Sequence, residues 1–269
     1  MSRAGARPPV VSLAEAAFAT AFPGLSVEDA FALRSTADLD AHLRTDGARS
    51  PRVSMADEAR AGSAGVPEHE YALPDGRVDL PRLLARFDAG ASLVVSQFHE
   101  THPPLGRFCR GLEKLFLHAV QANIYLTPPA AQGFRTHYDT HDVLVLQVEG
   151  RKRWRVWDGE RVARPTRRTP WPGSMEPVGE PHVLTLAPGD ALYIPRGVMH
   201  DAATEGGGHS LHVTVGLLEA SWAQGLRLLL DAAEEDDAAL RESVPTWRLG
   251  EADLAPALAD ALARLAGPA

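Results

Sequence analysis

The sequence GFRTHYDTHDVLVLQVEGRKRWRVW, residues 133–157, decides how this chain of 269 residues folds. It holds two runs rich in β-branched and aromatic residues, 143–148 and 152–157, and the turn signal Glu149-Gly150 separates them. Just ahead of the first run, His137 and Asp139 are two residues apart. On an extended chain such residues project to the same side, so the imidazole and the carboxylate can reach one point.

Further strand-like runs lie outward from this stretch, at 93–98, 120–126, 183–186, 191–194 and 211–217. Turn signals such as Asp158-Gly159 and Pro188-Gly189-Asp190 separate the later ones, and no helical pattern interrupts them. Several short strands with tight turns are typical of antiparallel sandwiches and jelly-roll barrels. The predicted fold class is therefore mainly β with flanking helices.

Helical patterns lie on both sides of this region. We expect helices over 12–22, 35–44, 80–87 and 105–119, the last with apolar residues at three- and four-residue spacing. Residues 45–76 are rich in Gly, Ser, Pro and charge, which predicts an extended segment. In the C-terminal tail, leucines around 226–230 and 254–265 predict two amphipathic helices.

Composition excludes several classes of protein. The chain has 27 basic and 35 acidic residues and a formal net charge of −8, which disfavours broad nucleic-acid binding. Cys109 is the single cysteine, so an internal disulfide and a Cys-based zinc site are excluded. The sequence shows no secretory signal and no apolar run of about 18 residues. We therefore expect a soluble, cytoplasmic protein without a membrane span.

A metal site is the strongest functional prediction. His200 follows the bend Pro195-Arg196-Gly197, which can carry it back toward His137 and Asp139. Two histidines and one carboxylate on one face of a metal form the facial triad of non-haem Fe(II) oxygenases. An H-x-D tripeptide alone is a weak signal that arises often by chance, so the prediction of a metal site depends on the surrounding residues.

Those surrounding residues form long motifs: NIYLTPP at 123–129, GFRTHYD at 133–139, LQVEGRKRW at 146–154, PGDALYIPRG at 188–197 and SLH at 210–212. With them, the chain resembles the cupin-type JmjC oxygenases of the ribosomal oxygenase family over roughly 80–218. The resemblance implies a double-stranded β-helix that uses Fe(II), 2-oxoglutarate and O2 to hydroxylate an amino-acid side chain. It also implies that His137, Asp139 and His200 bind the iron.

The resemblance further implies three parts: an N-terminal helical and loop segment (1–92), a JmjC core (93–218) and a C-terminal helical segment (219–269). The ribosomal oxygenases carry a helical dimerisation region and a winged helix after the core. About fifty residues follow Leu218, enough for a dimerisation element but too few for both modules. We therefore expect a homodimer by analogy, and the alternative is that the tail helices pack on the barrel or on the N-terminal helices. The missing winged helix leaves the substrate open between a protein or peptide and a free or carrier-bound amino acid.

Strand parity supports a co-substrate site independently of the resemblance. Lys152 shares a strand face with Trp154 and Val156, and a lysine on an apolar inward face is costly unless it meets an anion. In the family a basic residue here pairs with the distal carboxylate of 2-oxoglutarate, so Lys152 is predicted to bind it. The alternative is a lysine that reaches solvent at a strand end.

Three more polar residues resemble positions that contact the co-substrate in the family, or can add a hydroxyl to the pocket: Asn123, Tyr125 and Ser210. The alternative for each is a satisfied polar group of the core.

The stretch 151–168, with eight Lys/Arg against two acidic residues, is either a substrate-docking edge or a charged outer face with an arginine-rich loop. The functional alternative to an oxygenase is a non-oxidative metal-binding cupin, either an isomerase or a ligand-binding module. A sugar-binding cupin has no need of Lys152.

Overall fold

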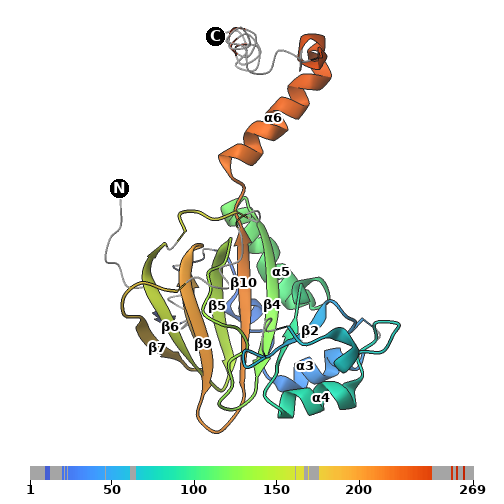
Figure 1. Ribbon diagram of the computed structural model, residues 1–269, viewed down its shortest axis with the longest axis vertical. Helices are drawn as coiled ribbons and strands as arrows, with labels where there is room; N and C mark the ends of the chain where they lie inside the picture. Colours follow the sequence, from blue (N-terminus) through green and yellow to red (C-terminus); the bar gives the residue numbers. More distant parts are fainter. Residues whose placement is uncertain are drawn as a thin grey trace. The chain divides into compact units, whose positions relative to one another are not determined.

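Strands dominate the region around residues 133–157, and they form two antiparallel sheets that face each other (Figure 1). The larger sheet has the order β1-β8-β5-β10-β4-β3-β2, and the smaller sheet has the order β7-β6-β9. The larger sheet consists of β1 (Val10–Ser12), β2 (Val53–Ala56), β3 (Ser92–Val95), β4 (Ala119–Thr127), β5 (Asp142–Glu149), β8 (Asp190–Ile194) and β10 (Ser210–Leu218). The smaller sheet consists of β6 (Arg151–Glu160), β7 (His182–Leu186) and β9 (Val198–Glu205).

This computed structural model describes residues 10–12, 20, 22, 24–45, 47–60, 65–160, 162–166, 169, 176–243, 256, 259 and 263. The chain divides into two units, Met1–Glu219 and Ala220–Ala269. Both sheets belong to the first unit, and α6 (Trp222–Asp236) and the short 3-10 helix η3 (Ala238–Arg241) belong to the second. Within the described ranges, no helix is long and apolar enough to cross a membrane.

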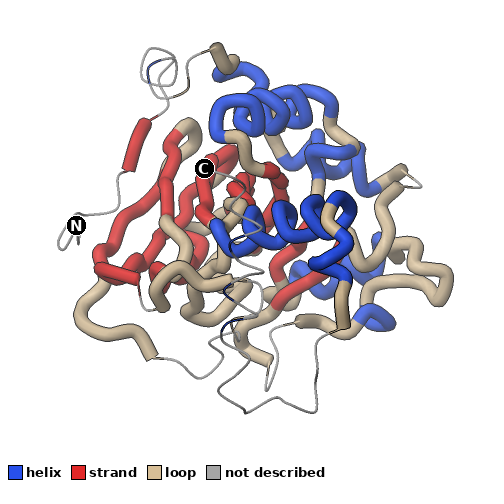
Figure 2. The backbone as a smooth tube through the Cα atoms, turned by 90° about the horizontal axis from the view of Figure 1, so that it is seen from above, coloured by secondary structure: helices blue, strands red, loops and turns tan. Residues whose placement is uncertain are grey.

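Helices of the first unit cover one face of the larger sheet, and Figure 2 shows most strands of this unit on one side and most of its helices on the other. They are α2 (Val27–Ala30), α3 (Thr36–Leu43), α4 (Leu80–Asp88) and α5 (Pro103–Phe116), with the 3-10 helices η1 (Glu68–Glu70) and η2 (Phe98–Glu100). The imidazole of His102 caps the start of α5, and the buried side chains Leu105, Phe108 and Leu112 belong to the core that this helix shares with the sheet. This helical layer leaves the other face of the larger sheet to the smaller sheet.

Alternate residues of a strand point to opposite faces of the larger sheet. One face packs in a core beneath the helices, and the other faces the space between the two sheets. The odd-numbered residues of β10, such as Val213 and Val215, pack in the core beneath the helices. The even-numbered His212 and Thr214 instead line a cavity between the sheets. Across that space, Trp154 and Val156 of β6 form a second core with β5 and β8. The candidate site therefore lies between the two sheets, on their inward faces.

Most of the expected elements are present. The mainly β jelly-roll core is confirmed, and the strand runs expected at 120–126, 143–148, 152–157, 183–186, 191–194 and 211–217 are β4, β5, β6, β7, β8 and β10. The helices expected at 35–44, 80–87 and 105–119 are α3, α4 and α5, and the first tail helix is α6. The helix expected over 12–22 and the leucines at 254–265 lie almost wholly outside the described residues.

Two strands differ from expectation. The segment 45–76 contains β2, which pairs with β3 at the edge of the larger sheet, so part of it is ordered by backbone hydrogen bonds. The chain from Val198 to Glu205 forms β9, although only a bend and His200 were expected there. Its residues have weak strand propensity, and the pairing with β6 supplies what local sequence does not.

Candidate active site

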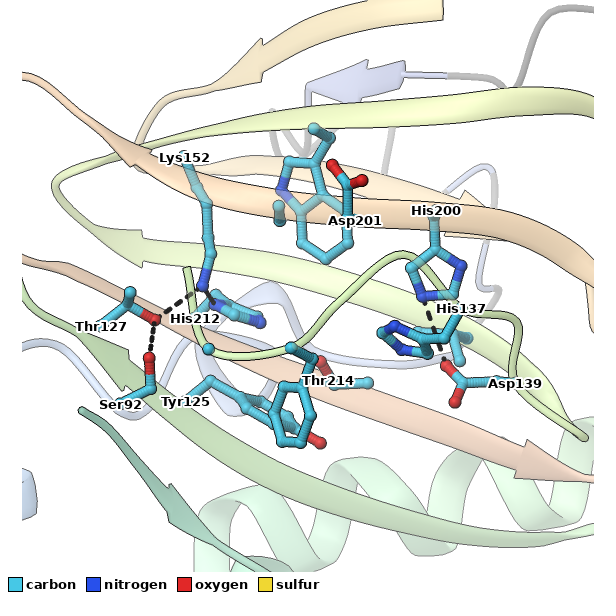
Figure 3. A pocket seen from close by; sticks show the side chains of 15 residues that line it. Ser92, Tyr125, Thr127, His137, Asp139, Lys152, His200, Asp201, His212 and Thr214 are labelled. Atoms are coloured by element: carbon cyan, nitrogen blue, oxygen red, sulfur yellow. Dashed lines mark hydrogen bonds and ion pairs between the residues drawn. The ribbon is translucent and has the colours of Figure 1, made fainter. Parts of the chain in front are cut away.

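A cavity of about 230 Å³ lies between the sheets, and its lining comes from the inward faces of both (Figure 3). The residues that line it are Ser92, Tyr125, Thr127, Gly133, Phe134, His137, Asp139, Val143, Lys152, Trp154, His200, Asp201, Ala202, His212 and Thr214. Figure 3 shows two groups of polar side chains in it, one around Asp139 and one around Lys152.

The first group brings His137, Asp139 and His200 together. One potential ligand atom from each lies within 4.8 Å of the others. Backbone hydrogen bonds join the segments that carry them: His137 N donates to His200 O at 3.0 Å, and His200 N donates to His137 O at 2.7 Å. Gly197, at φ 81°, donates its N–H to Asp139 O at 2.9 Å, so the expected bend places β9 against the loop before β5.

Both imidazoles are oriented by backbone carbonyls. Nδ1 of His137 lies 2.7 Å from the carbonyl oxygen of Arg135, and Nδ1 of His200 lies 3.0 Å from that of Val198. A carbonyl oxygen only accepts hydrogen bonds, so Nδ1 carries the proton in both rings and Nε2 carries the lone pair. This is the arrangement in which metal-ligating histidines are usually held.

The electrostatics also fit a cation. Burial lowers the pKa of His200 to about 4, and the charge of His137 adds to this effect, while Asp139 opposes it. His200 is therefore neutral at pH 7, as a metal ligand must be. Its Nε2 lies 3.6 Å from Oδ2 of Asp139, too long for a hydrogen bond but suited to two atoms that share an ion. Two imidazole nitrogens and one carboxylate fit Fe(II).

A salt bridge next to the triad connects the segments that carry His137 and His200. Arg155 of β6 donates from Nε and Nη2 to the buried carboxylate of Asp201, at 2.8 Å and 2.6 Å. Asp201 also accepts a hydrogen bond of 2.6 Å from the hydroxyl of Thr136. Because Thr136 precedes His137 and Asp201 follows His200, this network joins the two ligand-bearing segments a second time.

The second group is centred on Lys152, which is only 4% exposed. Its Nζ donates to Thr127 Oγ1 at 2.8 Å, and Ser92 Oγ donates to the same oxygen at 3.1 Å. Nδ1 of His212 lies 3.4 Å from Nζ. Burial lowers the pKa of Lys152 to about 7, because its desolvated charge has only these neutral neighbours. An anion that enters this end of the cavity would restore the charged form.

Tyr125 and Phe134 form the wall between the two groups. The ring of Tyr125 is stacked on that of His212, with centroids 5.0 Å apart and planes 8° apart, and it meets Phe134 edge-on. Burial, and after it the charge of Asp139, raise the pKa of Tyr125, so its phenol stays protonated. Gly133 packs closely against Ser92. A Cβ at this position would come within 2.8 Å of Ser92 Oγ, which favours glycine there.

The structure thus places Lys152 and Tyr125 in the cavity, but Asn123 and Ser210 outside its lining. Asn123 Oδ1 accepts a hydrogen bond from the backbone N–H of Gln97 at 2.9 Å. Ser210 Oγ is fully buried and accepts one from Nε2 of Gln147 at 3.0 Å. Ser210 therefore has the satisfied contacts of a core polar group, whereas Asn123 is half-buried and its side chain also hydrogen-bonds Tyr125.

Sequence reasoning missed the roles of Ser92, Thr127, Asp201 and His212. Thr127 and His212 each share a strand face with a predicted residue, Tyr125 and Ser210, so the i, i+2 rule could have found them. Ser92 enters from β3, whose pairing with β4 brings it beside Thr127, and no local signal marks it.

A family model described as the JmjC domain matches residues 95–225. The two-sheet core and the triad lie largely within the matched residues, so this part of the chain is similar to the JmjC domain. The chain is also similar in sequence to the ribosomal oxygenases.

The chain is 35% identical over 220 residues to the "Bifunctional lysine-specific demethylase and histidyl-hydroxylase NO66" of Aedes aegypti. It is 34% identical over 220 residues to "Ribosomal oxygenase 1" of Homo sapiens. Each alignment covers 79% of this chain and 34% of the relative, so the chain spans about a third of the length of these curated proteins.

Among solved structures, the chain is similar to YcfD, a ribosomal oxygenase from Escherichia coli in complex with cobalt and 2-oxoglutarate. The TM-score is 0.56 at 20% identity, and the match covers 96% of this chain and 62% of that one. At this identity the likeness supports the fold.

Proposed function

We propose that this chain is an Fe(II)- and 2-oxoglutarate-dependent oxygenase that hydroxylates an amino-acid side chain in a protein or peptide. The observation that carries the proposal is that one cavity holds both a two-histidine, one-carboxylate group and a buried lysine. A sugar-binding cupin has no need of a desolvated lysine there. The names of the relatives, which include histidyl-hydroxylase and ribosomal oxygenase, support the same activity.

The residues would divide the work as follows. His137, Asp139 and His200 would hold Fe(II), and Lys152 would pair with the distal carboxylate of 2-oxoglutarate. Thr127 Oγ1 already accepts two hydrogen bonds, so its own hydrogen is left for a carboxylate oxygen. Tyr125 and Phe134 would flank the co-substrate and exclude water. Iron held there would supply the activation of O2, so that one oxygen atom goes to succinate as 2-oxoglutarate loses CO2 and the other is inserted into a C–H bond of the substrate.

The test is anaerobic reconstitution with Fe(II) and 2-oxoglutarate, followed by oxygen and a panel of histidine-containing peptides. We expect succinate release and a peptide that gains the mass of one oxygen atom. Free amino acids in the same panel test the narrower substrate class, and a gain of mass there alone would contradict a peptide substrate. Metal binding without any 2-oxoglutarate binding would identify a non-oxidative cupin instead.

We infer in addition that α6 contacts a second copy of the chain. Its side chains Trp222, Leu226 and Leu229 are 90%, 62% and 66% exposed, and an apolar stripe of this size is costly in water. Light scattering at micromolar concentration should report a dimer, which Leu226→Ser with Leu229→Ser should dissociate. A monomeric wild-type protein would contradict this contact and leave the proposed chemistry untouched.

A further inference from the structure

His212 lies beside Lys152 in the cavity, on the strand β10 that runs antiparallel to β4 (Figure 3). An inference that rests on the proposed function follows from this contact. We propose that His212 is a positioning residue, whose neutral ring accepts a hydrogen bond from Lys152 and so aims the ammonium at the distal carboxylate of 2-oxoglutarate.

The hydrogen-bond inventory of Lys152 is the first argument. An ammonium group has three donors and no acceptor. In this structure one donor goes to Thr127 Oγ1 at 2.8 Å, and a second faces Nδ1 of His212 at 3.4 Å. Two fixed acceptors determine the direction of the third N–H, which remains for an incoming carboxylate. One acceptor alone would let the ammonium rotate about a single hydrogen bond.

The chemistry of the acceptor is the second argument. A carboxylate at this position would neutralise Lys152 and repel the carboxylate of the co-substrate. A neutral imidazole accepts the same hydrogen bond and leaves the positive charge for the ligand. Burial, and after it the charge of Lys152, hold the pKa of His212 well below its ordinary value, so the ring stays neutral.

The packing of the ring is the third argument. His212 is 3% exposed, stacked on Tyr125 at 5.0 Å, and met edge-on by Trp154 at 5.6 Å. These two rings hold the plane of the imidazole, and its Nδ1 faces Lys152. Since an ammonium cannot accept, the proton of the ring must be on Nε2.

The matched variants are His212→Phe, which keeps a ring against Tyr125 but has no acceptor, and His212→Asn, whose amide oxygen can occupy nearly the position of Nδ1. The measurement is calorimetric titration of the Mn(II)-loaded protein with 2-oxoglutarate. A hydrogen bond to a charged group predicts binding about tenfold to a hundredfold weaker in His212→Phe, and nearly wild-type binding in His212→Asn. Metal affinity should be unchanged in both.

The pH profile separates positioning from a merely structural role. The affinity of the wild type should fall on the alkaline side as Lys152 loses its proton, and this fall should begin at lower pH in His212→Phe, because the acceptor that stabilises the ammonium is gone. The other ionisable groups that line the cavity are Tyr125, Asp139, Asp201, His137 and His200. Saturating Mn(II) holds the triad in one state, and Asp201 is ion-paired with Arg155.

Equal affinity in His212→Phe and the wild type would overturn the proposal, as would equally weak binding in both variants with an unmoved pH profile. If His212→Phe does not fold, nitrogen NMR of the wild type decides, and a proton on Nδ1 of His212 would overturn the proposal. A wild-type protein that binds Mn(II) but no 2-oxoglutarate would contradict the proposed function itself, so the two failures are distinguishable.

Discussion

At the metal end of the cavity, backbone groups orient the side chains: carbonyl oxygens of Arg135 and Val198 fix both imidazoles, and His137 and His200 exchange main-chain hydrogen bonds. At the lysine end, side chains orient one another, since Thr127, Ser92 and His212 surround Lys152. The carboxylate of Asp139 is also more exposed than Lys152, since its side chain is 25% exposed and Lys152 is 4% exposed. A substitution of Asp139 should therefore spare the fold, whereas one of Lys152 should change stability and ligand affinity together.

The largest effect is expected at Asp139. Asp139→Ala removes the one anionic ligand, so metal binding and turnover should fall to background. The side chain is 25% exposed, so the melting temperature without metal should stay nearly the same. Metal titration and succinate release measure the first effect, and a thermal melt measures the second. Full turnover in this variant would refute the triad.

Substitution of Lys152 should have the next largest effect. Lys152→Ala should weaken 2-oxoglutarate binding by two or more orders of magnitude, since stranding one partner of a buried charge pair costs roughly 3–5 kcal/mol. Lys152→Arg should retain part of the affinity, because it keeps the charge but needs more room. Metal affinity should not change in either variant.

Lys152→Met sharpens the comparison, because it fills the same space without a charge. The empty protein should become more stable, since a desolvated charge is lost, but addition of 2-oxoglutarate should no longer raise the melting temperature. Wild-type affinity in Lys152→Ala would move the carboxylate site elsewhere. The other candidates for a carboxylate site, Arg135 and Arg196, do not line the cavity. Arg135 donates a hydrogen bond to Arg60 O at 2.8 Å, and Arg196 lies 3.7 Å from the carboxylate of Glu219.

A pH change should act on the lysine end with opposite signs on stability and on affinity. The pKa of Lys152 is about 7 in the folded protein, below the 10.5 of an exposed lysine. The unfolded chain thus binds more protons between these values, and the stability of the empty protein should rise with pH across that window. Affinity for 2-oxoglutarate should fall in the same window, by up to about tenfold per pH unit. Parallel changes of the two quantities would contradict this assignment.

Strand parity explains why one end of the site could be predicted and the other only in part. Lys152 stands out because a charged residue interrupts the apolar face of its strand, and that is visible in six consecutive residues. Ser210 and His212 share a face equally well, yet the register pairs His212 with Tyr125 in the cavity and Ser210 with Thr127 at its end. Which residues of a strand reach the cavity depends on the register with the partner strands, and the local sequence does not determine that register.

The smallest effect is expected from the network behind the metal. Arg155→Met leaves the buried carboxylate of Asp201 with only the hydroxyl of Thr136, and both groups flank metal ligands. Loss of such support typically weakens metal binding at least tenfold, and because Arg155 acts through Asp201 we expect about tenfold. Arg153→Met is the matched control, since this exposed arginine lies on the same outward face of β6. Competition with a fluorescent chelator measures the metal affinity, while calorimetry checks that 2-oxoglutarate affinity at saturating metal is unchanged. If Arg153→Met weakens metal binding as much as Arg155→Met does, general surface charge is responsible, and the network does not orient the triad.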